Sequence, residues 1–220
     1  MSIEQRHARV MDGMSRFGIP LGFKGLDLPI APDCGDGTIA TYGVKFSIKG
    51  LKFVGDYRYR GERYLYDDRG YMDEHVRYGF KVSNREINYS YVINNQVPQV
   101  VEAFEPYRTC VYYDSYAFKY QGRSFEDNPT YFNLHENKSI DVDGRNNIYT
   151  LHPAQFWDAE LCERALGYGP DEVIARLQGK VQDVRRLTNG VYLVLNDDPK
   201  LTYEDFVKMN EQIKPILGVI

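Results

Sequence analysis

Histidines beside carboxylates are the residues of this chain best suited to acid–base chemistry. Asp73 and Glu74 precede His75, and Glu136 follows His135. Adjacent residues on a strand point to opposite faces of a sheet, so neither stretch is a ready-made acid–base pair. An enzyme would therefore need a composite site, built from tyrosine, histidine and carboxylate side chains that lie far apart in the chain.

Metal-binding and cofactor-binding patterns are not found in the sequence. His75, His135 and His152 could bind a metal only together with a distant carboxylate, since no short spacing preorganises them. Residues 141–146 carry alternate acidic groups before a glycine but no glutamate at the distance that a calcium loop requires. We interpret them as a polar turn. Phosphate-binding glycine loops and hydrolase or kinase motifs are missing as well, so we expect no catalytic residue, no metal and no cofactor.

The three cysteines, Cys34, Cys110 and Cys162, are widely spaced and form no CxxC pair. This pattern argues against a disulfide framework and against a zinc site. We interpret Cys110 and Cys162 as small buried side chains.

Charge is spread unevenly along the 220 residues. The net charge of −4 argues against general nucleic-acid binding. Residues 124–220 hold 16 acidic and 10 basic residues, a balance of −6, which predicts an acidic face for a basic partner. The charged first ten residues do not form a secretory signal, and no apolar run is long enough for a membrane span. We therefore expect a cytoplasmic protein without membrane contact.

The first part of the chain predicts a helix followed by an irregular arm that ends near residue 40. Ser2 and Gln5 have the spacing of a capping box, so a helix is expected from Ile3 to about Phe17. The Gly- and Pro-rich passage after it indicates an irregular connection.

Residues 41–120 alternate mainly with period two, which is typical of antiparallel strands with one buried face. The alternating apolar sets lie in 42–48, 76–82, 87–93 and 112–120. Residues 67–70 predict a hairpin turn between strands. Asn94 and Asn95 are expected to cap a short helix that carries Val97 and Phe104.

Residues 140–220 predict helices and a hairpin. One helix is expected to begin at Pro153, carry Trp157 and end at Gly167, and a second to begin at Pro170. The runs on either side of Thr188-Asn189-Gly190 predict a hairpin, because Asn-Gly is a strong two-residue turn signal. A closing helix from about Thr202 to Lys214 is expected to be structural, with Phe206, Met209, Ile213 and Leu217 on its buried face.

Together these elements predict the α+β class: a mainly antiparallel sheet with helices packed on it, in one compact domain over residues 1–220. Fourteen of the 19 tyrosines lie between residues 42 and 120, more than a core alone would use. Part of the sheet is therefore expected to be an exposed, aromatic binding surface.

Three passages resemble the small α+β immunity proteins of bacterial polymorphic toxins and type VI secretion effectors. They are DGRNNIYTLHPAQFWDAELCERAL (143–166), NGVYLVLNDDPKLTYEDF (189–206) and MNEQIKPILG (209–218). The resemblance covers about residues 140–220 and implies a protein that acts by binding, without catalytic residues. It implies occlusion or distortion of the active site of a cognate toxin. An inhibitor in the cytoplasm favours a toxin that acts there, such as a nuclease or a nucleotide-consuming enzyme.

Two acidic clusters are the predicted partner-binding residues. The first is the loop Asn196, Asp197 and Asp198, which follows a strand and should project from the sheet. The second places three carboxylates near an aromatic anchor, a common interface arrangement; its members are Trp157, Asp158, Glu160 and Glu163. Two alternatives stay open: an enzyme with a composite tyrosine, histidine and carboxylate site, and a carbohydrate- or nucleotide-binding module. The sequence does not predict the oligomeric state.

Overall fold

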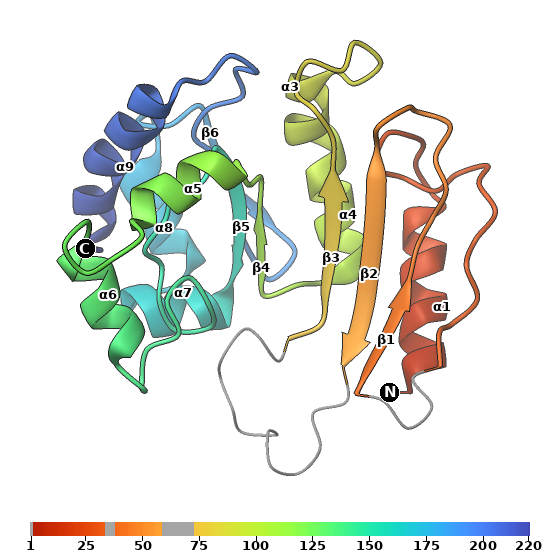
Figure 1. Ribbon diagram of the computed structural model, residues 1–220, viewed down its shortest axis with the longest axis horizontal. Coiled ribbons are helices and arrows are strands. Elements are labelled where there is room, and N and C mark those ends of the chain that lie inside the picture. Colours follow the sequence, from red (N-terminus) through yellow and green to blue (C-terminus); the bar gives the residue numbers. More distant parts are fainter. Residues whose placement is uncertain (1, 34–37, 59–72) are drawn as a thin grey trace. The chain divides into compact units, whose positions relative to one another are not determined.

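The computed structural model describes residues 2–33, 38–58 and 73–220, and it confirms the α+β class with two antiparallel sheets (Figure 1). Its contacts group the described residues into two compact units, divided between Glu105 and Pro106. The single-domain organisation stays a prediction. The turn predicted at 67–70 and Cys34 lie outside the described residues.

The first unit begins with α1 (Ile3–Met14), capped as the sequence predicts. The Ser2 hydroxyl accepts a hydrogen bond from the Gln5 amide, and the Gln5 side chain accepts one from the Ser2 amide. The helix ends before Phe17, because the Phe23 amide donates to the Met14 carbonyl at 2.8 Å and draws the chain back onto the last turn.

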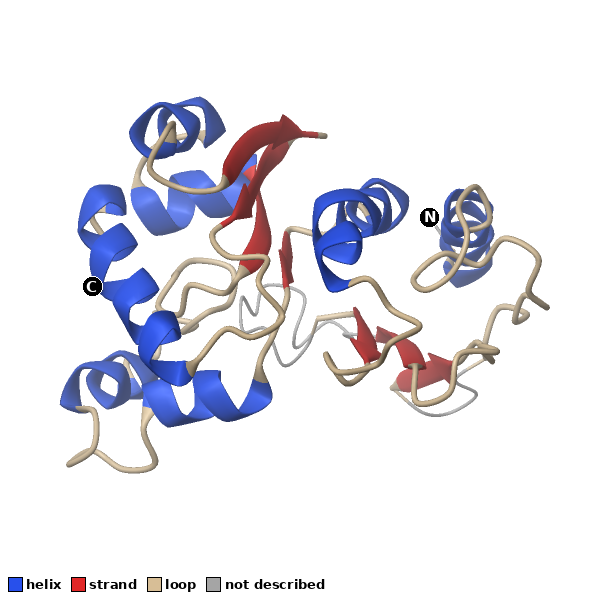
Figure 2. Cartoon of the chain, turned by 90° about the horizontal axis from the view of Figure 1, so that it is seen from above, coloured by secondary structure: helices blue, strands red, loops and turns tan. Residues whose placement is uncertain are grey.

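A three-stranded antiparallel sheet follows, in the order β1-β2-β3, formed by β1 (Ile39–Tyr42), β2 (Lys52–Arg58) and β3 (His75–Gly79). Helices α1 and α4 (Val97–Phe104) lie on one side of it (Figure 2). The buried face is aromatic: Tyr42 stacks on Tyr57 with ring centroids 5.3 Å apart, and Phe53 also contacts Tyr42. The tyrosines of this face therefore form core, as cross-strand aromatic pairs do.

Two stretches predicted as strands are helical. Residues 87–93 enter α3 (Tyr89–Tyr91) and the π-helical turn η2 (Val92–Gln96), and residues 112–120 enter α5 (Asp114–Gln121). Aromatics in these stretches also recur at helical spacing, and Tyr116 and Tyr120 both contact Phe206. The predicted caps Asn94 and Asn95 lie inside η2; Asn88 caps this helical segment instead. The strand predicted over 42–48 is also wrong, since β1 covers Ile39–Tyr42 and the chain leaves the sheet after Tyr42.

The second unit has the sheet order β4-β5-β7-β6, with β4 (Arg108–Cys110), β5 (Ala154–Asp158), β6 (Asp183–Leu187) and β7 (Gly190–Val194) all antiparallel. Its helices are α5, α6 (Pro129–Glu136), α7 (Ala159–Leu166), α8 (Pro170–Leu177) and α9 (Tyr203–Leu217). Along the described chain no helix combines the length and the apolar character needed to cross a membrane.

The prediction of a helix that begins at Pro153 is wrong for the residues up to Asp158. Residues 154–158 form β5, and α7 begins only after Asp158, whose carboxylate accepts from the Leu161 amide. Bulky residues 156 and 157 alternate between the two faces of a buried sheet, a pattern that a short window cannot distinguish from a helix. The predicted helix end at Gly167 and the predicted start of the next helix at Pro170 are both confirmed.

The hairpin of β6 and β7 is confirmed, but its two turn residues are Thr188 and Asn189. Leu187 pairs with Gly190, and Thr188 takes the left-handed conformation with φ of 48°. Gly190 is the first residue of β7. A side chain does not fit at this position, because a Cβ would lie 2.1 Å from the Trp157 carbonyl oxygen. The glycine therefore permits close strand approach rather than a turn.

Helix α9 closes the core of the second unit. Its apolar residues Phe206, Met209, Ile213 and Leu217 are buried. They share one cluster with the strand residues Val184, Val191 and Leu193 and with Leu195, which directly follows β7. Asn210, on the same helix, is fully buried: its Oδ1 accepts from the Leu151 amide at 2.8 Å, and its Nδ2 donates to the Leu151 carbonyl at 2.9 Å.

Replacing Phe206 by Ala should lower the free energy of unfolding by about 3–5 kcal/mol, because the ring is fully buried and leaves a cavity. Phe118→Ala is the control, since Phe118 lies on a helix with 55% of its surface exposed, and it should cost less than about 0.5 kcal/mol. Denaturant unfolding measures both. Equal costs would show that α9 does not pack as described.

Replacing Asn210 by Leu should lower the free energy of unfolding by about 2–4 kcal/mol, since it leaves the Leu151 amide and carbonyl buried without partners. Gln212→Leu, on the exposed side of the same helix, controls for the change in side-chain type. If both variants unfold at the same denaturant concentration, the Leu151 backbone does not depend on this amide.

Candidate functional site

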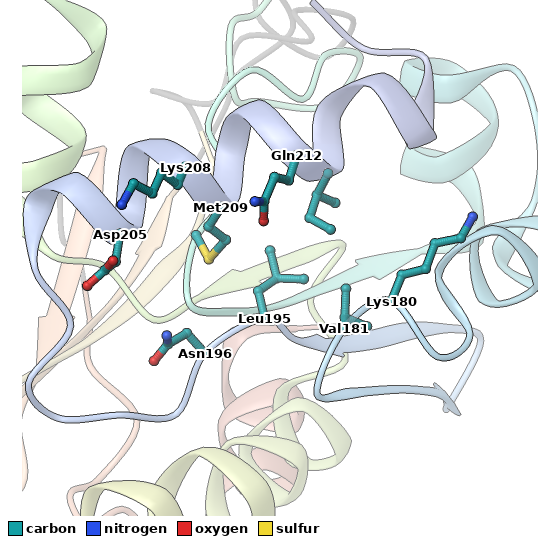
Figure 3. Close-up of a pocket in the computed structure, with 9 residues that line it drawn as sticks. Lys180, Val181, Leu195, Asn196, Asp205, Lys208, Met209 and Gln212 are labelled. Atoms are coloured by element: carbon teal, nitrogen blue, oxygen red, sulfur yellow. The ribbon is translucent and has the colours of Figure 1, made fainter.

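An open groove of about 250 Å³ lies between α9 and the start and end of the β6–β7 hairpin (Figure 3). Its floor is apolar and is formed by Val181, Leu195, Met209 and Ile213. These residues belong to the core cluster or pack on it, so the groove is a place where the core reaches the surface.

Polar residues border the floor. Asn196 and Asp205 lie at one end of the groove, Lys180 at the other, and Lys208 and Gln212 come from the α9 wall (Figure 3). On α9, positions 205, 208, 209, 212 and 213 follow spacings of three and four, which places them along one side of the helix. Sequence reasoning missed the three polar groups from positions 180, 208 and 212. For Lys208 and Gln212, the signal that could have revealed them is their spacing of three and four residues along α9.

The predicted acidic loop begins in this groove. Asn196 Oδ1 accepts from the Asp198 amide, and Asp198 Oδ1 accepts from the Lys200 amide, both at 2.8 Å. The Asp197 amide donates to Gln182 Oε1 at 2.9 Å. Asp198 is exposed, whereas Asn196 and Asp197 are half-buried. The loop is therefore held in a defined turn beside the groove.

The second predicted cluster lies elsewhere. Asp158 pairs with Gly190 at one end of β5, whereas Ala154 pairs with Val194, just before Asn196. A strand of this length spans roughly 15 Å. The structure therefore does not bring the two predicted clusters together.

Members of this second cluster have structural partners. Burial raises the pKa of Asp158, and its carboxylate caps α7. Glu160 pairs with Arg164 one turn later, at 3.3 Å, and is largely exposed. Glu163 is exposed. Among these three carboxylates, only Glu163 has neither a capping role nor an ion pair within the described residues.

Trp157 is wrong as a partner contact. Its side chain is fully buried in β5 and belongs to the core cluster. The prediction placed it on a helix near exposed charges, but β5 directs it into the core. It cannot reach a partner while the chain keeps this fold.

His75 lies close to two oxygen acceptors of the first unit. His75 Nε2 lies 3.0 Å from Asp56 Oδ2 across the β2–β3 pair, and Nδ1 lies 3.3 Å from the Asp73 carbonyl. Glu74, its sequence neighbour, pairs with Arg6 instead, as expected for residues on opposite faces. Both ring nitrogens of His75 therefore face oxygen atoms of its own unit.

The other histidines lie in unrelated surroundings. His7 is buried between the Tyr57 hydroxyl (3.1 Å) and the Pro29 carbonyl (2.9 Å), and His135 stacks on Tyr131. Burial lowers the pKa of His152 to about 4. Within residues 2–33, 38–58 and 73–220, no group of three or more His, Cys, Asp or Glu side chains is placed to hold a metal ion.

A buried charge network, centred on Asp143, was read from the sequence only as a polar turn. Its Oδ1 accepts from Arg108 (3.0 Å) and from the amides of Tyr149 (2.7 Å) and Thr150 (2.8 Å). Burial raises the pKa of Asp143, but Arg108 and the Thr150 hydrogen bonds outweigh it, so the pKa lies below the usual range. Oδ2 also accepts from the Gln121 side-chain amide at 3.3 Å. These bonds to the backbone, to a buried cation and to a side-chain amide indicate a structural role.

A comparison of the chain with protein-family models, with curated proteins and with solved structures finds no match.

The unfolding free energy should depend on pH through His152. Its pKa is 6.5 when unfolded and about 4 when folded, so its contribution is complete above pH 6.5 and is lost as the pH falls toward 4. Between pH 7.5 and 4.5 this amounts to roughly 2–3 kcal/mol. The variant His152→Gln should lose this part of the slope in denaturant unfolding. His135→Gln, at an exposed site, should keep it; equal slopes in all three proteins would contradict the burial of a neutral imidazole.

Proposed function

We propose that this chain is an immunity-type inhibitor, which binds a cognate toxin that acts in the cytoplasm and blocks its active site. The observation that carries the proposal is the groove between α9 and the hairpin, where apolar core residues reach the surface beside an acidic loop. Strong protein interfaces combine a small apolar centre with a charged rim. The resemblance of residues 140–220 to immunity proteins supports the same function.

The charge of this region favours a basic partner. Residues 124–220 have a balance of −6, and the loop and the start of α9 place four carboxylates within nine positions: Asp197, Asp198, Glu204 and Asp205. Enzymes that act on nucleic acids or nucleotides present basic surfaces to phosphate groups. An acidic inhibitor surface accelerates association with such enzymes. The preferred target is therefore a nuclease or a nucleotide-consuming toxin.

The partner can be identified with the tagged full-length chain. Pull-down from the native host, followed by mass spectrometry, should recover one protein that is toxic when produced alone and harmless when produced with this chain. Recovery of metabolic enzymes only would contradict the proposal. Turnover of a small molecule by the purified chain alone would favour the composite-site enzyme instead.

Changing both Asp197 and Asp198 to Lys should slow association with the toxin about tenfold or more at low salt and flatten its salt dependence, because steering depends on long-range charge. Surface plasmon resonance at two salt concentrations measures both effects. The free energy of unfolding should change little, since both residues lie in a surface loop.

Glu136→Lys is the matched control. Glu136 is an exposed residue of the same unit at the end of α6, and its change has the same sign as each loop substitution. Glu136→Lys should reduce the association rate less than Asp197→Lys or Asp198→Lys made singly. If the control slows association as much as the loop variants, general net charge rather than the loop governs binding.

A further inference from the structure

We infer that the groove receives an extended segment of the partner, with one apolar side chain on the floor, a carboxylate toward Lys180 and a cationic side chain toward Asp198. This inference rests on the proposed function and specifies the chemistry of the partner at the same site. It follows from three features of the groove: its apolar floor, its amide-bearing walls and its charged ends.

The apolar floor has room for one side chain of the partner rather than for several in a row. Val181, Leu195, Met209 and Ile213 form only the apolar part of an open groove of about 250 Å³, and polar side chains line the rest. A bound amphipathic helix would need a long groove for anchors at spacings of three, four and seven. A short groove with one apolar centre fits a single side chain of leucine size on an extended chain.

The walls offer hydrogen bonds to a peptide backbone. Gln212, on the α9 wall, and Asn196, opposite it, both carry amide groups at the groove (Figure 3). The Asn196 Oδ1 is used by the Asp198 amide, which leaves its Nδ2 as the group that can donate to a partner. Amides can both donate and accept, which matches the exposed backbone groups of an extended segment.

The ends differ in charge. Lys180 is exposed at one end and makes no ion pair within the described part of the chain. At the other end the acidic loop continues from Asn196 to Asp198, which is exposed, and Asp205 lies beside it. The Asp205 carboxylate accepts a hydrogen bond from the Thr202 hydroxyl at 2.7 Å as part of the α9 cap, so we take the exposed Asp198 as the acidic group available to a partner. A segment with opposite charges on its two sides therefore complements the groove.

Peptides can test this with the full-length chain. The probe is a fluorescein-labelled peptide Glu-Gly-Leu-Gly-Lys with blocked ends, followed by fluorescence polarisation and by amide chemical shifts. The shifts should centre on Val181, Leu195 and Met209, and replacing the peptide's leucine by glycine should weaken binding at least about tenfold. Shifts centred elsewhere, or equal binding of the two peptides, would overturn the inference.

Charge reversal tests the orientation. Lys180→Glu should weaken binding of the parent peptide and make Lys-Gly-Leu-Gly-Lys the preferred peptide. Asp198→Lys should make Glu-Gly-Leu-Gly-Glu the preferred peptide. In each case the ratio of the dissociation constants should change by about threefold or more. Lys138→Glu, at an exposed site on the same unit, should leave the order of the peptides unchanged. The same order of peptides in all variants would overturn the assignment of charges to the two ends.

The two proposals fail separately. If no peptide binds while toxin association still depends on Asp198, the inhibitor function stands and the groove inference is wrong. If the peptides bind in the expected order but no toxin is recovered, the groove inference stands and the inhibitor function is wrong.

Discussion

The second unit depends on burying a segment that is neither helix nor strand. Residues 149–153 are buried, yet buried backbone amides must find partners. Side chains supply them: the Asp143 carboxylate accepts from the amides of Tyr149 and Thr150, and Asn210 pairs with both backbone groups of Leu151. Arg108 keeps the Asp143 carboxylate charged and in place. Without these two side chains, the segment could not lie beneath α9 at an acceptable free energy.

The same segment positions the groove. The Pro153 carbonyl accepts from the amides of Leu195 and Asn196, at 2.8 and 3.0 Å. These bonds hold the end of β7 where Leu195 reaches the floor and Asn196 begins the acidic loop. On the other side, Asn210 anchors α9, the helix that supplies Met209 and the groove wall. The surface feature that carries the proposed function is therefore fixed by buried polar bonds.

Sequence patterns predicted elements with strong local signals and missed those decided by packing. The capping box at Ser2, the helix from Pro170 and the buried face of α9 are set by neighbouring residues, and the structure confirms them. Trp157 and the tyrosines of α5 were misplaced because alternating aromatics suit a strand and a helix equally over short windows. The Asp143 network could not be predicted, since its partners lie up to 35 positions away.

For the site, the sequence identified the acidic loop but not its setting. Asp197 and Asp198 were expected to project, and hydrogen bonds within the loop do hold Asp198 at the surface. The apolar floor arises where the end of a hairpin diverges from a helix, a geometry that no local pattern encodes. A defined turn beside an apolar opening loses little conformational entropy when it binds. That preorganisation supports the proposal that this part of the chain binds a protein partner.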